Sequence, residues 1–260
     1  MTDRQPTWLE AVLRQQWLPV FILLIAIPAV AWLWIAAMAR DMYGSMGGAS
    51  AWMMTPVWDP QHLLLLWAMW AVMMAAMMLP SAVPALMLFG MHARRRAEDG
   101  SGALRIYIFA VGYLIAWSLF SVVAVALQRL LGRLLMLSPM MEASTPRLSA
   151  ALLVMAGIYQ FTPLKQACLS SCQSPLGFFM RRWRHGTSGA LRMGTEHGAL
   201  CVGCCWALML LLFAGGVMNL AVILALTALV AFEKLAPIGA WGARASGALL
   251  MALGLWMFAR

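Results

Sequence analysis

Long apolar runs separated by short polar segments are the feature that most constrains how this chain folds. About 20 consecutive apolar residues are enough to cross the hydrocarbon core of a bilayer as a helix. Because lipid offers the backbone no hydrogen-bond partners, each run must satisfy its own amide and carbonyl groups, and a helix does so. Hydrophobic residues make up 63% of the 260 residues and charged residues 10%, so the polar segments are too short to fold separately. The sequence therefore predicts an all-α, polytopic transmembrane helix bundle.

Seven membrane spans are predicted from the apolar runs. They cover residues 18–39, 62–90, 106–127, 148–163, 198–214, 218–233 and 241–258. Gly215, Gly216 and Asn219 predict a tight turn between the fifth and sixth spans, because Gly and Asn favour turns. If these two runs form one helix instead, the number of spans is six. A single helix of about 35 residues would overshoot the bilayer, which favours two helices.

The remaining segments fit a single bundle. Residues 1–17 are predicted to be a cytoplasmic N-terminal segment, and residues 18–260 to form the bundle itself. Residues 128–147 are interpreted as an interfacial helix, since Arg129 and Arg133 lie four residues apart on one face.

The basic residues decide the orientation of the predicted bundle. Thirteen Lys and Arg residues fall on the side of the N-terminus and five on the opposite side. Because cytoplasmic loops carry an excess of Lys and Arg, the N-terminus is expected inside and the C-terminus outside. The longest loop, residues 165–197, is then cytoplasmic and lies within a Cys-rich inner-face region, residues 164–205. Topology also explains the net charge of +9, and no basic helix or aromatic–basic module indicates nucleic-acid binding.

All five cysteines fall in two groups with helical spacing. Cys168 and Cys172 are four residues apart, and Cys201, Cys204 and Cys205 follow the pattern i, i+3, i+4. Residues three or four apart share one face of a helix, so each group can direct its sulfurs to one point. Both groups are expected at the cytoplasmic ends of neighbouring spans, which brings them together. Converging thiolates suit Cu(I), with Zn(II) or an iron–sulfur cluster as alternatives, and simple packing of small buried residues is the non-functional interpretation.

Methionine is the second soft ligand in the sequence, with 23 residues. Met73, Met74, Met77 and Met78 lie on adjacent helical stripes of the second predicted span. These side chains are interpreted either as a soft packing face or as thioether relay ligands that pass Cu(I) across the bilayer. His62, at the mouth of the same span, would extend the relay outward.

Three further residues are candidates for a functional role. Glu233 is a carboxylate at the inner end of the sixth span, where it is either functional or part of a solvated helix end. Lys165 precedes the first Cys group and would favour thiolate over thiol. His197 precedes the second Cys group by four residues, so it is either an auxiliary ligand or a solvated side chain. Pro80 and Pro84 are expected to break the second span and free backbone carbonyls inside the bundle.

Several motifs resemble a bacterial family described as predicted metal-binding integral membrane proteins. The motifs are AAMMLP at residues 75–80, YQFTPLKQACLSSC at 159–172, CVGCCWALM at 201–209, MNL at 218–220 and EKLAP at 233–237. The resemblance covers roughly residues 63–239 and is most specific in the Cys block. It implies a bundle in the bacterial cytoplasmic (inner) membrane and a bound metal, and it supplies neither a substrate nor a mechanism.

Three functions follow from these residues. The leading hypothesis is a Cu(I) transporter or membrane copper chaperone, with the five cysteines as its inner site. A membrane thiol–disulfide oxidoreductase that uses a quinone is the first alternative, although no outer-face Cys is present to relay electrons. A metal-stabilised, non-catalytic subunit of a larger membrane complex is the second. The expected partners are membrane lipid, a metal ion and other membrane or metal-chaperone subunits, and the absence of a catalytic constellation argues against an enzyme.

Overall fold

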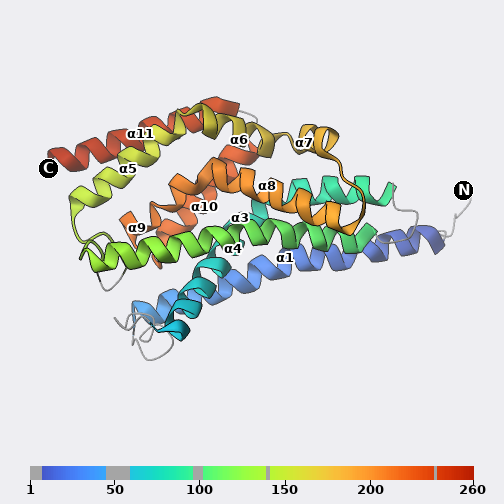
Figure 1. The fold of residues 1–260 in the computed structure, drawn as a ribbon, viewed down its shortest axis with the longest axis horizontal. Coiled ribbons are helices and arrows are strands. Elements are labelled where there is room, and N and C mark those ends of the chain that lie inside the picture. Colours follow the sequence, from blue (N-terminus) through green and yellow to red (C-terminus); the bar gives the residue numbers. More distant parts are fainter. Residues whose placement is uncertain (1–7, 45–58, 96–101, 139–140, 237–238) are drawn as a thin grey trace, which may run out of the picture.

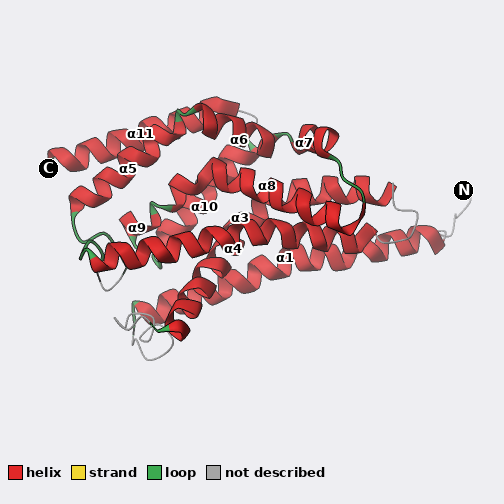
Figure 2. Ribbon diagram, in the orientation of Figure 1, coloured by secondary structure: helices red, strands yellow, loops and turns green. Residues whose placement is uncertain are grey.

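The computed structural model describes the chain except for residues 1–7, 45–58, 96–101, 139–140 and 237–238. Within the described residues the fold is helical, and an isolated β-bridge joins Leu137 to Ala143 (Figure 2). In chain order the helices are α1 (Trp8–Met42), α3 (Pro60–Arg95), α4 (Gly102–Arg133), α5 (Pro146–Gln160), α6 (Pro163–Gln173), α7 (Pro175–Arg182), α8 (Gly186–Met209), α9 (Leu212–Gly215), α10 (Leu220–Leu235) and α11 (Gly239–Ala259). The predicted all-α class is confirmed.

Helix α8 lies between two groups of helices (Figure 1). On one side it packs along α4, which in turn packs against α3, and α1 lies against α3. On the other side α8 contacts the short helix α6, while α5 and α11 run side by side as a separate pair. Helix α10 contacts α3, α6, α8 and α11. The cysteines of α8 and the end of α10 are therefore enclosed by the bundle.

Five helical segments are long and apolar enough to cross a membrane. They are Leu24–Met42, Pro60–Ala93, Leu104–Arg133, Gly186–Gly215 and Ala240–Ala259. Helices α5 and α6 give a sixth if the pair, bent by 67° at its break, counts as one broken span. Helix α10 has only 16 residues and is too short to be included. The structure therefore supports five or six spans and does not confirm the predicted seven.

The predicted long loop at residues 165–197 is wrong, because most of this segment is helical. It contains nearly all of α6, the whole of α7 and the first half of α8. Thr162 caps α6 by accepting a hydrogen bond from the Lys165 amide at 3.3 Å, and Pro163 follows at the first helical position. The many polar residues resembled a loop, but Leu169, Phe178 and Phe179 are buried. Their burial holds these short helices against the bundle.

The predicted interfacial helix at residues 128–147 is also wrong. Helix α4 continues through its first part to Arg133, and an irregular segment then leads to the Thr145 cap of α5. Leu135 and Met141 have φ values of 56° and 57°, in the left-handed region that ends a right-handed helix. By contrast, the predicted turn between the fifth and sixth spans is confirmed. Gly216 has φ of 93°, and Asn219 caps α10.

The prolines of α3 change the hydrogen bonding of the helix, but the helix continues past them. Helix α3 runs through Pro80 and Pro84, so the expected break is absent, although Figure 1 shows that the helix changes direction along its length. Pro80 has no amide hydrogen to donate to the Ala76 carbonyl. That carbonyl oxygen instead accepts a hydrogen bond from Trp32 Nε1 at 3.2 Å. A side chain of α1 thus satisfies the group that the proline leaves free.

Close packing of α4 and α8 depends on glycine. A Cβ atom added at Gly194 would lie 2.1 Å from the Phe109 carbonyl oxygen, and one at Gly198 would lie 2.9 Å from the Tyr113 carbonyl oxygen. Small residues at such positions let two helix backbones approach each other. This approach places Tyr113 of α4 against Cys201 of α8.

Gly194→Leu is therefore expected to destabilise the protein by about 1–3 kcal/mol, because the side chain would force α4 and α8 apart. Ala199→Leu is the matched control, since Ala199 lies on the same helix but is exposed. The free energy of unfolding, measured by denaturant titration of the purified variants, checks the expectation. Equal stability of the two variants would contradict this account of the packing.

Candidate metal centre

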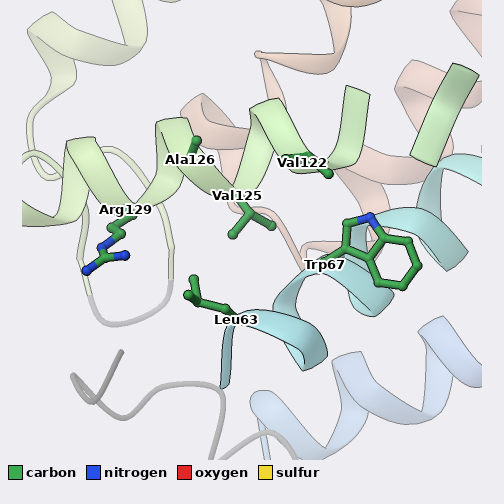
Figure 3. Close-up of a pocket in the computed structure, with 6 residues that line it drawn as sticks. All are labelled: Leu63, Trp67, Val122, Val125, Ala126 and Arg129. Atoms are coloured by element: carbon green, nitrogen blue, oxygen red, sulfur yellow. The ribbon is translucent and has the colours of Figure 1, made fainter. Parts of the chain in front are cut away.

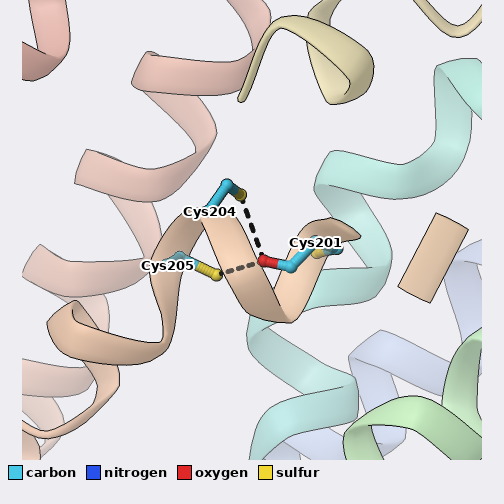
Figure 4. A group of neighbouring side chains, drawn as sticks. All are labelled: Cys201, Cys204 and Cys205. Atoms are coloured by element: carbon cyan, nitrogen blue, oxygen red, sulfur yellow. Dashed lines mark hydrogen bonds between the residues drawn. The ribbon is translucent and has the colours of Figure 1, made fainter. Parts of the chain in front are cut away.

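Three cysteines of α8 form a buried group of sulfurs. The Sγ atoms of Cys201, Cys204 and Cys205 all lie within 4.8 Å of one another, and each residue is 1% exposed. Figure 4 shows the three side chains on neighbouring positions of one helix, α8. The Cys204 and Cys205 thiols donate hydrogen bonds to the Cys201 carbonyl oxygen at 3.1 and 3.0 Å. The predicted convergence of this group is confirmed by the geometry.

The two cysteines of α6 take different positions relative to this group. Cys172 is partly exposed, and its side chain lies close enough to Cys201 and Cys204 to interact with them electrostatically. Cys168 is buried against α8 at Gly203, where an added Cβ would lie only 2.8 Å from the Cys168 Sγ atom. Both cysteines of α6 therefore lie near the cysteines of α8 but outside the group of three sulfurs that lie within 4.8 Å of one another.

Lys234, near the end of α10, points into the cysteine group. It is 6% exposed, and its Nζ atom donates hydrogen bonds to Cys201 Sγ at 2.8 Å and to Ser81 Oγ at 3.2 Å. The Met78 Sδ atom lies 3.8 Å from the same nitrogen and 3.9 Å from Cys205 Sγ. A buried cation next to a thiol stabilises the thiolate form, which is the form that binds metals.

Tyr113 of α4 completes the surroundings of Cys201. Its hydroxyl donates to the Met78 carbonyl oxygen at 3.2 Å and lies 2.9 Å from Cys201 Sγ. Neither Tyr113 nor Lys234 was predicted as a site residue. Tyr113 gives no signal in the sequence, whereas a lysine in an apolar helix, such as Lys234, is a signal that it has a buried partner.

Glu233 and Lys165 form a buried ion pair behind the cysteines. Lys165 Nζ and Glu233 Oε2 are 2.6 Å apart, and the two side chains are 0% and 2% exposed. Gln160 Nε2 and Ser246 Oγ donate to the other carboxylate oxygen at 2.6 and 2.7 Å. Gln173 Nε2 donates to the Glu233 carbonyl oxygen at 2.6 Å. This network joins α5, α6, α10 and α11, so the interpretation of Glu233 as part of a solvated helix end is wrong.

Adjacent residues of α10 therefore face opposite ways. Glu233 is held by α5, α6 and α11, while Lys234 reaches the sulfurs of α8 and α3. By fixing the end of α10, the ion pair positions Lys234 at the cysteine group.

The two histidines proposed as auxiliary ligands lie in different places. His197 is 3% exposed and packs against the rings of Phe109, Tyr113 and Phe178, so it is not a solvated surface residue. Its Nδ1 atom has no hydrogen-bond partner among the described residues. His62 is buried near the start of α3. Helical rise places it roughly 24 Å from Met78, so the structure does not bring it to the cysteines.

The methionine stripe of α3 is buried along its whole length. Met73, Met74, Met77 and Met78 are each 0–1% exposed. Met78 is the member whose sulfur reaches the cysteine group, through Cys205. The others continue from it toward the end of α3 that carries His62.

An apolar pocket of about 280 Å³ lies near that other end, between α3 and α4 (Figure 3). It is lined by Leu63, Trp67, Val122, Val125, Ala126 and Arg129. No cysteine is part of this lining. The pocket therefore does not place an apolar electron acceptor such as a quinone next to the thiols.

The donor set of the cysteine group fits a soft metal ion. Thiolate and thioether ligands select Cu(I), whereas carboxylate and carbonyl ligands suit Mg²⁺ or Ca²⁺. The group provides the thiols of Cys201, Cys204 and Cys205 and the Met78 thioether, and the Cys172 thiol lies nearby. The described residues thus form a helical fold with a buried, sulfur-rich site that could hold a metal ion.

Comparison with known families agrees with this description. The family model PpoB2, described as copper chaperone, matches residues 67–257. The chain therefore belongs to the PpoB2 copper chaperone family, and the matched region contains the cysteines, Met78, Glu233 and Lys234. No curated protein and no solved structure matches the chain.

Proposed function

We propose that this protein is a membrane-embedded copper chaperone that holds Cu(I) at Cys201, Cys204 and Cys205. The observation that carries the proposal is the buried group of three thiol sulfurs on one helix face, with Cys172 and the Met78 thioether beside it. The apolar helical segments support a position in the bacterial cytoplasmic (inner) membrane, with the N-terminus inside and the C-terminus outside. Its substrate is the copper ion itself.

The mixed thiol and thioether donor set of the site supports Cu(I) over a divalent ion bound by thiolates alone. A buried site is stable only when its charges are compensated. Thiolates bring negative charge, and Lys234, within 2.8 Å of Cys201 Sγ, brings one positive charge in addition to that of the metal. The thioether adds a soft ligand without adding charge, which Zn(II) sites rarely use.

The methionine stripe supports movement of Cu(I) through the protein. Met78 lies at the cysteine group, and Met77, Met74 and Met73 continue from it along α3 as relay ligands, with His62 at the far end. Exchange between neighbouring thioethers would let Cu(I) move without being hydrated. Transport across the membrane is thus proposed as an extension of the chaperone function.

Met78→Leu separates the ligand role of this residue from its packing role. Leu and Met have similar volumes, so the cost in stability is expected to be below about 1.5 kcal/mol. Loss of the thioether is expected to weaken Cu(I) binding about tenfold. Met69→Leu is the matched control, because Met69 is equally buried on the same helix and lies about 13 Å further from the cysteines. Competition with a Cu(I) chelator measures both affinities.

Metal analysis of the protein purified without oxygen tests the proposed function. About one equivalent or more of copper is expected after addition of Cu(I), and a Cys204→Ser, Cys205→Ser double variant is expected to lose it. Stoichiometric zinc or iron in place of copper would contradict the proposal. A metal-free protein with a titratable disulfide would instead favour the thiol–disulfide oxidoreductase, and a metal that chelators cannot remove would favour the structural subunit.

A further inference from the structure

A polar cavity of about 200 Å³ opens between α6, α7 and α8. It is lined by Ser171, Phe178, Arg181, Arg182 and Leu200. Ser171 directly precedes Cys172, and Leu200 directly precedes Cys201. The cavity therefore lies between the helices that carry Cys172 and Cys201, next to these residues in the sequence.

The surroundings of this cavity carry a strong excess of positive charge. Arg182, Arg184 and Arg192 all pair with Glu196, at 3.3, 3.6 and 3.2 Å. Glu196 is the only acidic residue in the sequence between Glu142 and Glu233. One carboxylate is thus shared by three guanidinium groups.

Arg181 adds a fourth exposed cation to this surface. Its Nε atom donates to the Gly177 carbonyl oxygen at 3.2 Å. A second cavity of about 240 Å³, lined by Arg181, Arg182, Trp183, Arg184 and Glu196, continues the basic surface. Guanidinium groups arranged in this way bind carboxylate or phosphate oxygens.

We propose that this cavity is the entry site for Cu(I) carried as an anionic complex with a carboxylate-bearing thiol, and that Cys172 is the first sulfur to take the ion. The inference rests on the proposed function and adds the chemical class of the copper donor. Arg181 and Arg182 bind the carboxylates of the donor at the mouth of the cavity. Cys172 is partly exposed, whereas Cys201, Cys204 and Cys205 are each 1% exposed.

The transfer is a ligand exchange in which copper keeps its +1 oxidation state. The Cys172 sulfur forms a bond to Cu(I), the bond to the donor sulfur breaks, and the Cys172 proton leaves with the donor thiolate. Because the Cys172 side chain neighbours Cys201 and Cys204, a second exchange of the same kind moves the ion into the buried group. No oxidant or reductant is needed.

The rate of Cu(I) transfer tests this entry site separately from the equilibrium affinity of the metal centre. Two donors are compared, the anionic complex of Cu(I) with glutathione and the cationic complex of Cu(I) with acetonitrile. In an Arg181→Gln, Arg182→Gln variant, transfer from the glutathione complex is expected to be about tenfold slower at low salt. High salt should remove most of the difference. Transfer from the acetonitrile complex should not slow, and Cu(I) affinity should stay unchanged.

Two further variants complete this test. Arg192→Gln is the matched control, because Arg192 is exposed and pairs with Glu196 but lies outside the lining of both cavities. Cys172→Ser should slow transfer from both donors more than Cys168→Ser does. Equal slowing of both donors by the arginine variant, or no slowing of either, would overturn the proposed entry site. Failure of the unmodified protein to bind Cu(I) from either donor would instead overturn the proposed function.

Discussion

Glu233→Ala is expected to destabilise the protein by about 3–5 kcal/mol, one of the largest effects of any single substitution outside the metal centre. The substitution leaves Lys165 buried without its counter-ion, at a position that is 0% exposed. It also removes the acceptor of the Gln160 and Ser246 hydrogen bonds. Unsatisfied buried polar groups add to the cost of the unpaired charge. Denaturant titration followed by circular dichroism measures the change.

A double variant separates the unpaired charge from the loss of packing. Lys165→Met combined with Glu233→Gln removes both charges while keeping side chains of similar length. Replacing a buried ion pair by neutral groups is often close to neutral, so the double variant should recover most of the lost stability. A double variant as unstable as Glu233→Ala would contradict the assignment of the effect to an unpaired lysine. It would indicate instead that the loss of stability comes from altered side-chain packing.

Cys201→Ser is expected to reduce Cu(I) affinity by about 100-fold or more, the largest effect expected on metal binding. Replacing a residue that only supports a metal ligand typically lowers metal affinity about 10–100-fold. Cys201 is proposed as a direct ligand, so a larger loss is expected. Its sulfur lies next to Lys234 and Tyr113 and close to the Cys204 and Cys205 sulfurs. A serine hydroxyl keeps the volume similar but is a hard oxygen ligand that suits Cu(I) poorly.

Cys168→Ser is the matched control for this prediction. Cys168 is also a buried cysteine, but its sulfur contacts the backbone of α8 at Gly203 and lies outside the closely spaced group. Its replacement should change Cu(I) affinity less than tenfold. Competition with a Cu(I) chelator under reducing conditions compares the two variants. A larger loss in the Cys168 variant would show that α6 supplies the principal ligand.

The fold class followed directly from the sequence, while the boundaries of the polar segments did not. Apolar runs of spanning length identify helices, because the backbone amide and carbonyl groups must be hydrogen-bonded within the segment both in lipid and in a protein interior. Residues 165–197 have few apolar residues, and the helices there depend on caps such as Thr162 and on burial of Phe178 and Phe179. The contacts that bury Phe179 come from Phe89 and Phe109, far away in the sequence, so local composition could not predict them, whereas the Thr162 cap is a local signal.

In the proposed metal centre, too, local features were predictable from the sequence and contacts between distant residues were not. The spacing of Cys201, Cys204 and Cys205 placed them on one helix face, because helical periodicity is a local property. Lys234 and Tyr113 reach the site from α10 and α4, which only the packing of helices decides. For the same reason, spacing gave Cys168 and Cys172 equal weight, although Cys168 is buried and Cys172 is partly exposed.

X-ray absorption spectroscopy at the copper edge, on protein loaded with Cu(I) without oxygen, tests the central claim most directly. The account predicts an edge characteristic of Cu(I) and a first coordination shell of sulfur atoms. It also predicts that this shell changes in the Cys201→Ser variant and stays the same in Cys168→Ser. A shell dominated by nitrogen or oxygen, or one that is identical in all three proteins, would contradict a metal centre built on Cys201, Cys204 and Cys205.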